Sequence, residues 1–368
     1  MKVIILKSNL KSGLDVVGRG VGTTTNLPVL GTVLLEARNN QIKLSTTNLE
    51  LATTKIVFGK IIEEGEIAVS FSTLSGIVNN ISSERVNLEV KNINLIIKTD
   101  NYDARIQGLD TKDFPIIPTI KDKKEYLEIQ GELLKSALQK TTMAVEVSDL
   151  RPEIGGLLFA VEPTGIKIVG TDSFRLAEAT LSGKQIKNTF SKGLMITIPL
   201  RAAQELSRII EDKESVQIYT DETQILFQTE SFSMVSRLVE GKFPDYKAII
   251  PKSIENSVVV DREELINGLK LTSSFSGRNS EVTLRIKDKK TLEIFSSDSS
   301  IGENKFLLPV KADGQDMEII FNWQFLLSGV RGGQSKNVIL GLNGEEHPAI
   351  IKSPEEAGYF YILMPIKP

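Results

Sequence analysis

A threefold internal repeat is the feature that most constrains the fold of this chain of 368 residues. One helix-like pattern has Leu at its first and fifth positions and, in each case, a small residue or Gly in the fourth. It occurs as Leu10–Leu14, Leu134–Leu138 and Leu265–Leu269, with starts 124 and 131 residues apart. Leu at positions i and i+4 with a small residue between them favours a helix that packs closely against a sheet.

Three further landmarks recur in the same order and at a similar period. They are a polar residue after a strand (Asn48, Asp172, Asp298), a strand-to-helix junction (Ser70, Pro199, Asn322) and a strand opening with an aromatic residue (Tyr102, Phe232, Tyr359). Ser and Asn cap helix starts, and Pro is favoured in the first helical turn. Four landmarks in one order predict three repeats of about 125 residues each.

Each repeat is predicted to be α+β. In the first repeat a strand over residues 1–6 precedes a helix, and two strands flank the Asn48 turn. A strand over 66–70 then leads into a second helix over 72–80, and strands over 86–91, 94–99 and 103–107 complete the unit. Segments such as Val216–Tyr219 alternate with the period of a half-buried strand. Asp261 and Glu264 have the spacing of a helix capping box.

The predicted fold class is therefore three α+β domains, each an antiparallel sheet with two helices. Pro-containing and charged segments at 115–124 and 244–256 are the predicted linkers. We place the domains at residues 1–122, 123–250 and 251–368. Apolar residues make up 40% of the chain, which is enough to form hydrophobic cores. Charged residues make up 25%, which is less than is typical of disordered chains.

The composition argues against most catalytic chemistry. Cys is absent, so disulfides and thiolate sites are excluded, and a reducing cytoplasm is the expected location. The single His, His347, lies in Gly344–Pro348, which is predicted to be an exposed turn. Apolar runs fall short of the ~18–20 residues of a membrane helix, and Lys7 interrupts the first apolar segment, so neither a membrane span nor a signal peptide is expected. Carboxylates, Lys and Mg²⁺ can still support catalysis, so the composition disfavours an enzyme without excluding one. Our prediction is a protein that is not an enzyme and has no cofactor or metal.

Two alternatives stay open on the residues alone. Asp172 and Glu178 could form the acid pair of a carboxylate- or Mg²⁺-dependent hydrolase. The recurrence of a polar residue at the Asp172 position in all three repeats favours a structural role in a turn. A three-domain adhesion or scaffold protein is the other alternative, and the lack of disulfides and of an export signal counts against it.

Several motifs resemble those of the bacterial DNA polymerase III β subunit, the sliding clamp family. They are Asn26–Gly31, Arg151–Phe159, Thr171–Ala177, Gly241–Tyr246 and Leu363–Pro365. The resemblance spans the whole chain and implies a DNA sliding clamp, a processivity factor. It implies a head-to-tail homodimer in which six domains form a ring, with helices lining a central hole and sheets continuing across the interfaces.

The resemblance implies that the ring encircles double-stranded DNA without reading its sequence. A net charge of −3 argues against tight binding through a basic surface, whereas a ring needs only weak phosphate contacts. The expected DNA-facing residues are Lys7, Lys11, Lys135, Lys140, Arg201, Arg208, Arg262, Lys270 and Arg331. The second helix of the first repeat has no basic residue, so the expected lining is uneven. Thr24 and Glu153 stand where some relatives place Arg and Tyr against DNA.

The resemblance also implies a pocket between the second and third domains that binds short peptides with apolar anchors. The expected partners are the clamp loader, the DNA polymerase III catalytic subunit, and other polymerases or repair proteins; no membrane is expected. The pocket residues carried over are Ile154, Thr171, Ser173, Phe174, Arg175, Leu176, Pro244, Ile249, Asn322, Ile362, Met364 and Pro365. Many family members have Gly-His-Arg where this chain has Ser173-Phe174-Arg175, so Phe174 keeps a flat ring and loses the hydrogen bonds of the imidazole.

Overall fold

A computed structural model describes residues 1–22, 27–148, 150–183 and 186–367. Thr24 and Asn26, which carry sequence-based predictions, and Pro368 at the end of the third domain lie outside the described residues. The chain divides into two compact units. Unit 1 is Met1–Gly131, Lys187–Thr189 and Arg208–Leu238, and unit 2 is Glu132–Ile186, Phe190–Ser207 and Val239–Pro368.

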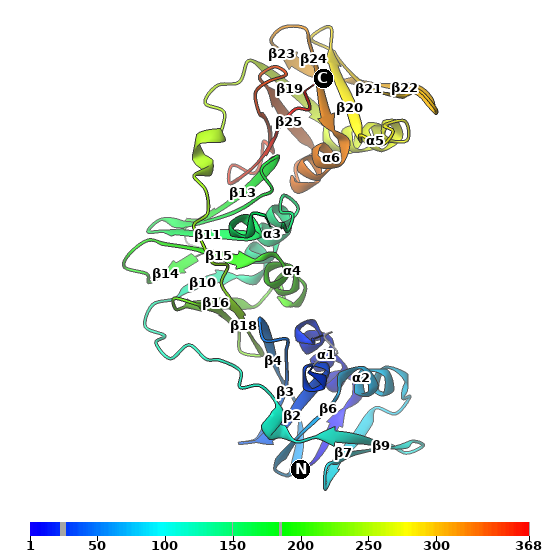
Figure 1. Ribbon diagram of the computed structural model, residues 1–368, viewed down its shortest axis with the longest axis vertical. Helices are drawn as coiled ribbons and strands as arrows, with labels where there is room; N and C mark the ends of the chain where they lie inside the picture. The colour runs from blue at the N-terminus through cyan, green and yellow to red at the C-terminus, as the bar shows by residue number, and fades with distance from the viewer. Residues whose placement is uncertain (23–26, 149, 184–185, 368) are drawn as a thin grey trace. The chain divides into compact units, whose positions relative to one another are not determined.

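The three repeats share one order of elements: a strand, a helix, five strands, a second helix and three strands (Figure 1). The first repeat comprises β1 (Lys2–Leu6), α1 (Lys7–Val17), β2 (Thr32–Arg38), β3 (Gln41–Thr47), β4 (Leu51–Val57), β5 (Gly59–Glu63), β6 (Gly65–Ser70), α2 (Phe71–Asn80), β7 (Arg85–Lys91), β8 (Asn94–Lys98) and β9 (Asp103–Leu109).

The other two repeats have the corresponding elements. The second comprises β10 (Leu127–Gln130), α3 (Gly131–Thr142), β11 (Gly156–Glu162), β12 (Gly165–Thr171), β13 (Arg175–Ser182), β14 (Ile186–Asn188), β15 (Leu194–Pro199), α4 (Leu200–Ile209), β16 (Ser215–Thr220), β17 (Gln224–Gln228) and β18 (Phe232–Arg237). The third comprises β19 (Asn256–Asp261), α5 (Arg262–Ser273), β20 (Glu281–Ile286), β21 (Thr291–Asp298), β22 (Gly302–Pro309), β23 (Lys311–Asp313), β24 (Met317–Asn322), α6 (Trp323–Gly332), β25 (Asn337–Leu342), β26 (Ala349–Lys352) and β27 (Tyr359–Leu363).

Each repeat has two strands that the sequence pattern did not reveal. One is the first strand after the first helix, and in the second repeat this is β11. Six of the seven β11 residues are buried, so the strand lacks the alternation that reports a half-buried strand. The other precedes the strand that leads into the second helix. Its copies β14 and β23 have only three residues each, too few to show a period.

In unit 1 one antiparallel sheet joins the second repeat to the first. Its strand order is β14-β10-β16-β17-β18-β4-β3-β2-β6-β9-β8-β7-β1-β5. The repeats meet at the β18–β4 pair, in which Ser236 lies opposite Leu51 and Phe232 lies opposite Lys55. We call this pair the first junction.

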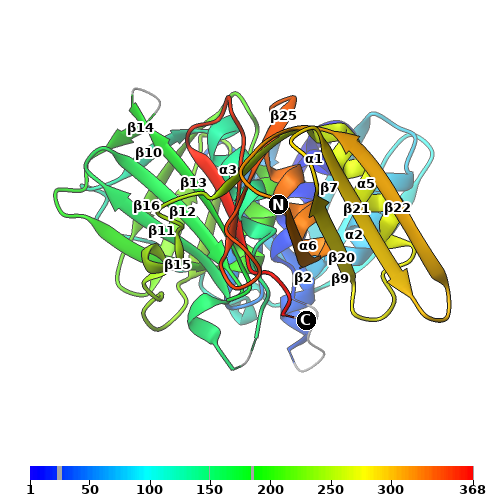
Figure 2. The ribbon, with the colours of Figure 1, turned by 90° about the horizontal axis from the view of Figure 1, so that it is seen from above.

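In unit 2 a second antiparallel sheet joins the third repeat to the second, in the order β15-β11-β12-β13-β27-β26-β25-β19-β23. The repeats meet at the β13–β27 pair, in which Leu363 lies opposite Arg175 and Tyr359 opposite Ala179; Figure 2 shows the red strand β27 beside the green strand β13. We call this pair the second junction. The two junctions have the same register. Leu51 and Arg175 each stand three residues after the recurring polar residue, and their partners Ser236 and Leu363 each stand four residues after the aromatic residue that opens the strand.

The counterpart of β4 and β13 in the third repeat is β22, which lies at the edge of a four-stranded sheet. The order of this sheet is β22-β21-β20-β24, so β24 forms its other edge. Among the described residues the ladder partner of β22 is β21. At the edge where β4 and β13 each pair with a strand of the neighbouring repeat, β22 has no partner among the described residues. We call this edge of β22 the open junction position.

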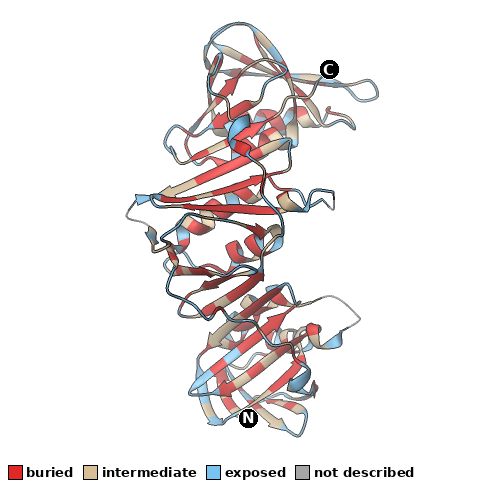
Figure 3. Cartoon of the chain, turned by 60° about the vertical axis from the view of Figure 1, so that its left-hand side comes forward, coloured by how far each residue is buried: buried red, intermediate tan, exposed pale blue. Residues whose placement is uncertain are grey.

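The cores lie between the helices and the sheets. Buried residues, red in Figure 3, follow the strands and the inner side of the helices. In α1 the buried positions are Leu10, Gly13, Leu14 and Val17, which share one helix face. A Cβ on Gly13 would lie 2.5 Å from Val57 Cγ1, so only Gly allows this approach to the sheet. The predicted close helix–sheet packing is confirmed here.

Three of the four residues predicted to start helices cap them with their side chains; the fourth, Pro199, was predicted in a first helical turn but is the last residue of β15, directly before α4. Ser70 accepts a hydrogen bond from the Thr73 amide at the start of α2. Asn322 accepts hydrogen bonds from the Gln324 and Phe325 amides at the start of α6. Asp261 accepts from the Glu264 amide at the start of α5. Each bond satisfies an amide that has no partner within its helix.

Candidate functional site

The recurring polar residue forms the same turn in the first two repeats. Asn48 Oδ1 accepts hydrogen bonds from the Glu50 and Leu51 amides, at 3.0 and 2.7 Å. Asp172 Oδ1 accepts from the Phe174 and Arg175 amides, at 2.9 and 3.0 Å. The predicted structural role of Asp172 in a turn is confirmed. Its carboxylate is used in holding backbone amides, which argues against an acid catalyst.

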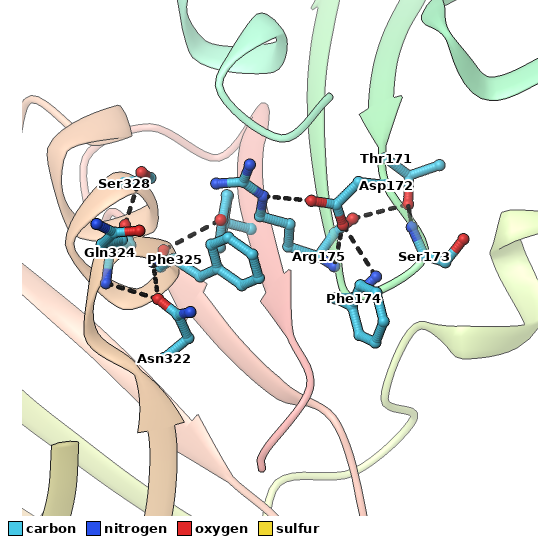
Figure 4. Close-up of polar contacts among 10 residues, drawn as sticks. Thr171, Asp172, Ser173, Phe174, Arg175, Asn322, Gln324, Phe325 and Ser328 are labelled. Atoms are coloured by element: carbon cyan, nitrogen blue, oxygen red, sulfur yellow. Dashed lines mark hydrogen bonds and ion pairs between the residues drawn. The ribbon is translucent and has the colours of Figure 1, made fainter. Parts of the chain in front are cut away.

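Arg175 links this turn to the third repeat within unit 2. Its Nε lies 2.7 Å from Asp172 Oδ2, and the two side chains are 12% and 4% exposed. The guanidinium carbon lies 4.0 Å from the centroid of the Phe325 ring on α6, a cation–π contact. Figure 4 shows Arg175 reaching toward Phe325 while the Phe174 ring points to a different side. Arg175 therefore holds the turn against α6.

An apolar cluster spans the second junction. Ile154, Leu176 and Ile362, all predicted pocket residues, are buried in it. Leu176 and Ile362 are directly opposite each other in the β13–β27 ladder. The remaining buried members are Leu158, Ala160, Val169, Phe243, Tyr246 and Ile350. The structure thus brings together predicted residues from three distant segments on one apolar foundation.

Ser173 and Phe174 are the exposed tip of the turn. Ser173 has a φ of +81°, an uncommon conformation for a residue with a side chain. Its hydroxyl accepts a hydrogen bond from Arg151 Nη1 at 2.8 Å. Thr171 Oγ1 accepts from the Ser173 amide and donates to the Arg175 carbonyl. The turn is fixed from several sides, so the Phe174 ring, 64% exposed, is presented in a set position.

The end of the chain runs beside this turn. The Met364 amide donates to the Phe174 carbonyl at 2.9 Å, which extends the β13–β27 ladder by one residue. Met364 and Pro365 are both half-buried. The Ile366 amide donates to the Ile320 carbonyl on β24 at 2.8 Å. The predicted tail residues therefore lie between the Phe174 turn and β24.

The other predicted pocket residues are held in different ways. Asn322 directs its amide oxygen at the start of α6, as described above. Pro244 is half-buried between Phe243 and Tyr246, which are both in the apolar cluster. Ile249, on the short helix Tyr246–Ile249, is 43% exposed. No described contact places Ile249 against the turn, so its part in the pocket stays a prediction.

Burial sets the protonation of two tyrosines at this junction. Burial, and then the neighbouring Glu178 carboxylate, raise the pKa of Tyr246 well above its ordinary value. Burial also raises the pKa of Tyr361, whose hydroxyl donates to the Phe325 carbonyl at 3.0 Å. Both phenols stay neutral at any physiological pH. The site therefore has an apolar and hydrogen-bonded character in which no tyrosinate takes part.

Some residues at the junction were missed by sequence reasoning. Phe325 contacts Arg175 although 150 residues separate them in the chain. Phe243 and Tyr246 stand in a motif of the predicted family, yet the prediction took only Pro244 from it. The available signal was residue type, because large aromatic side chains such as those of Phe243 and Tyr246 are usually buried even in a segment predicted to be a linker. The contact between Arg175 and Phe325 has no local signal.

The predicted DNA-facing residues have unequal surroundings. Lys11, Arg201, Arg208, Lys270 and Arg331 are exposed on helices. The Lys7 ammonium donates to the Ile81 carbonyl, and Arg262 pairs with Glu263 at 2.6 Å. Lys135 is half-buried. Lys140 is 14% exposed and pairs with Glu356 at 3.0 Å, so contact with DNA would require this ion pair to open. The DNA contacts stay predictions.

The described residues give the hydrolase alternative little support. Glu178 is buried in β13 and accepts a hydrogen bond from the Thr180 hydroxyl at 3.1 Å. The part of the chain that the structure describes contains no group of three His, Cys, Asp or Glu residues able to hold a metal ion. His347 is exposed in a turn, as predicted. No helix among the described residues is long and apolar enough to span a membrane.

Comparisons with known proteins agree along the chain. Residues 1–118, 128–245 and 247–367 match the N-terminal, central and C-terminal domains of the DNA polymerase III beta subunit family. The beta sliding clamp of Bacillus subtilis is 25% identical, with all of both chains covered. That of Chlamydia pneumoniae is 27% identical, covering 100% of this chain and 99% of the relative.

Solved structures give the same result. A DNA polymerase sliding clamp from Pseudomonas aeruginosa is 26% identical and superimposes with a TM-score of 0.93, with all of both chains covered. The sliding clamp of Bacillus subtilis superimposes with a TM-score of 0.93 at 24% identity, over 100% of this chain and 99% of that one, and so supports the fold alone. The predicted α+β fold of three repeated domains is confirmed.

Proposed function

Because the chain belongs to the DNA polymerase III beta subunit family, the non-catalytic beta sliding clamps, we propose that two copies close into a ring around duplex DNA. The ring tethers the replicative polymerase and other replication or repair proteins through the second junction. The clamp loader places it on DNA in the cytoplasm. Its domains are residues 1–122, 123–250 and 251–368.

The observation that carries the ring is the open junction position at β22. The two filled junctions have one register, with Ser236 opposite Leu51 and Leu363 opposite Arg175. Applied to the third repeat, this register pairs Ile301 beside β22 with Ile106 on β9 of a second copy. The same contact made twice joins two copies head to tail, and a heterologous interface that closes on itself gives a ring.

Exposed apolar residues gather at both halves of this proposed interface. Leu271, Ile301 and Leu307 around β22 are 52%, 57% and 56% exposed. Ile93 and Leu109, beside and on β9, are 56% and 41% exposed. Apolar side chains next to an unpaired strand edge mark an interaction surface. Pairing of β22 with β9 would cover these side chains and satisfy the edge.

Weak contact with DNA is sufficient for a ring. The net charge of −3 gives the protein no strong general attraction to phosphates. Exposed basic residues on the helices, such as Lys11, Arg201 and Lys270, can make sequence-independent phosphate contacts. Retention then rests on topology, and movement along DNA is easy because the contacts are weak.

The peptide pocket is proposed at the surface of the second junction. The buried cluster of Ile154, Leu176 and Ile362 supplies an apolar floor. Exposed Phe174 and half-buried Met364 and Pro365 border it. Met adapts its shape to different apolar partners, which suits a site shared by several proteins.

The ring proposal is tested by retention on DNA of two topologies. The protein is loaded by its clamp loader with ATP onto nicked circular DNA, complexes are isolated in high salt, and half the sample is linearised. Protein that stays on circles and leaves linear DNA is a topological clamp. Loss from the circles in high salt, with an active loader, would contradict the proposal.

The pocket proposal has a separate test. The probe is a short fluorescent peptide that carries a Leu-Phe pair between Gly and Ser residues. Replacing Met364 and Pro365 by Ala, or deleting residues 364–368, should lower the affinity for this peptide about fivefold, which corresponds to about 1 kcal/mol. Fluorescence anisotropy measures the affinity, and sedimentation checks that the dimer persists. Unchanged affinity would remove the tail from the pocket.

A further inference from the structure

The chain segment after Met364 is held to the rest of unit 2 by few polar interactions. Beyond the ladder bond of Met364, the described polar contacts are the bond from the Ile366 amide to the Ile320 carbonyl and an ion pair between Lys367 and Glu346. That ion pair has a separation of 3.7 Å and its side chains are 74% and 76% exposed. Exposed pairs of this kind contribute little to stability.

The same strand edge is covered more firmly in the other repeats. On β6 in unit 1, Leu109 and Gly108 pair with Ala68 and Val69 in a two-residue ladder. On β15 in unit 2, the Val239 amide donates to the Thr197 carbonyl at 2.8 Å, and the chain soon enters the apolar cluster at Phe243. The covering of β24 by Ile366 is the least anchored of the three among the described residues.

The edge of β24 has the features of a strand-addition site. Backbone groups of alternate residues point the same way along a strand, so Glu318 and Asn322 present theirs on the edge where Ile320 bonds Ile366. On the outer face Ile320 lies opposite Thr283, which lies opposite Phe295. An added strand would therefore gain backbone bonds and apolar contacts. Ile366, whose amide bonds Ile320, is itself half-buried, so this edge already accommodates an apolar residue.

We infer that residues 365–367 are a built-in ligand of the β24 edge, and that an extended apolar segment of a clamp partner takes their place. The inference rests on the proposed pocket, because Met364 and Asn322 connect that pocket to this edge. A partner would seat its apolar anchors on the cluster of Leu176 and Ile362 and continue along β24. Its own backbone amide replaces that of Ile366 at the Ile320 carbonyl.

A disulfide that pins the segment tests the exchange. The chain has no Cys, so Ile320→Cys with Ile366→Cys introduces one possible bond within a chain. The corresponding residues of the first repeat, Ala68 and Leu109, lie opposite each other, and opposite residues of antiparallel strands have Cα atoms about 4.5–5.5 Å apart, within the range of a disulfide. The oxidised protein should bind the labelled Leu-Phe peptide at least about tenfold more weakly than the same protein reduced. Each single Cys variant is a control, and the reduced double variant controls for folding.

Methyl NMR gives a direct view of the segment. The full-length protein is labelled at its Ile δ1 methyl groups. At saturating Leu-Phe peptide, the Ile366 methyl signal should become narrow and move to the chemical shift of an unstructured chain. Ile366→Val identifies the signal, and a peptide with Ala for both anchors should leave it in place. A variant lacking residues 366–368, which keeps Met364 and Pro365, should bind the peptide as tightly as the intact chain or more tightly.

The outcomes separate this inference from the proposed function. If the pinned protein binds the peptide as tightly as the reduced protein and Ile366 keeps its signal, exchange is overturned while the pocket stands. If no variant binds, including the one lacking 366–368, both fall. Weaker binding only when pinned, with release of Ile366 in the intact chain, supports both.

Discussion

The first and second junctions share a backbone and differ in their side chains. In each, the side chain of Asn48 or Asp172 accepts hydrogen bonds from the backbone amides two and three residues later. The backbone carbonyl at the tip of the turn accepts a further bond from the neighbouring repeat. The Arg237 amide donates to the Glu50 carbonyl, and the Met364 amide donates to the Phe174 carbonyl. The first junction has Glu50 at its tip and a Ser45–Thr54 hydroxyl pair on its strands. The second has Phe174 and an apolar cluster. One backbone arrangement therefore carries polar side chains at the first junction and an apolar cluster at the second.

The buried ion pair is a further difference. Where the second junction has Asp172 and Arg175, the first has Asn48 and Leu51, which are uncharged. Charges removed from water are stable only with good partners. Arg175 has Asp172 and the Phe325 ring, so it joins the two repeats of unit 2 at the cost of depending on both partners.

The largest effect is expected when Arg175 of the second junction is replaced by Leu, the residue at the corresponding position, Leu51, of the first junction. Arg175→Leu should lower the free energy of unfolding by about 3–5 kcal/mol, because the buried Asp172 carboxylate loses its cation. Asp172→Asn with Arg175→Leu, which reproduces the Asn48–Leu51 combination, should recover most of the loss. Guanidinium denaturation followed by fluorescence of Trp323, the single Trp, measures both. Equal losses in the single and double variants would show that packing on Phe325 matters more than charge.

The open junction position should be nearly as sensitive. Ile301→Asp puts a carboxylate opposite Ile106 of a second copy and should raise the dimer dissociation constant at least about 30-fold, or about 2 kcal/mol. Sedimentation equilibrium measures this. Ile116→Asp, at a linker residue that is 95% exposed, is the matched control and should leave the dimer intact. A dimer unaffected by Ile301→Asp would show that copies do not meet with the register of the two filled junctions.

A smaller effect is expected at the tip of the turn. Phe174→Glu, which copies Glu50, should leave the free energy of unfolding within about 0.5 kcal/mol, because Phe174 is largely exposed. It should lower the affinity for the Leu-Phe peptide about tenfold, because the apolar border of the proposed pocket becomes charged. The converse variant Glu50→Phe should create no peptide site, since its neighbours Ser45 and Thr54 are polar. Peptide binding by that variant would show that the tip alone determines the site.

The smallest effect concerns pH and Asp298, the recurring polar residue of the third repeat. Hydrogen bonds from the Ser300 hydroxyl, and then from the Ser300 amide, hold the pKa of Asp298 below its ordinary value. A depressed folded pKa gives stability that is present above the unfolded value, about 3.9, and lost as the pH falls through the folded value. Asp298→Asn should therefore flatten the fall of the denaturation midpoint below about pH 4. The Asn48 turn has no such group, so Asn48→Ser should leave the pH profile unchanged.

Local chemistry made the repeat and its turns predictable. Asn48 and Asp172 each bind the next amides along the chain, and Ser70, Asn322 and Asp261 cap helices that begin beside them. These interactions span a few residues, so they leave a pattern in the sequence. The small residue at Gly13 likewise marks a close helix contact. Such features could be derived without knowledge of the tertiary structure.

Contacts between distant segments had no such pattern. Nothing near Lys140 indicates that it pairs with Glu356, and it was therefore expected to face DNA along with more exposed residues. The contact of Arg175 with Phe325 and the seat of Ile366 on β24 also depend on which repeats meet. The pocket residues were proposed through family resemblance, and the structure shows how Ile154, Leu176 and Ile362 are brought together.

The shared register of the junctions also has a consequence for synthesis. On the ribosome β4 pairs with β3 first, and its other edge has no partner until β18 has been made, some 175 residues later; the edge of β13 that is not paired with β12 waits similarly for β27. Pairings between such distant strands form slowly. Each repeat thus spends part of translation with a bare strand edge, which is prone to mispairing with another nascent chain. Translation speed and chaperone access should therefore influence the yield of this protein more than the intrinsic stability of any one repeat.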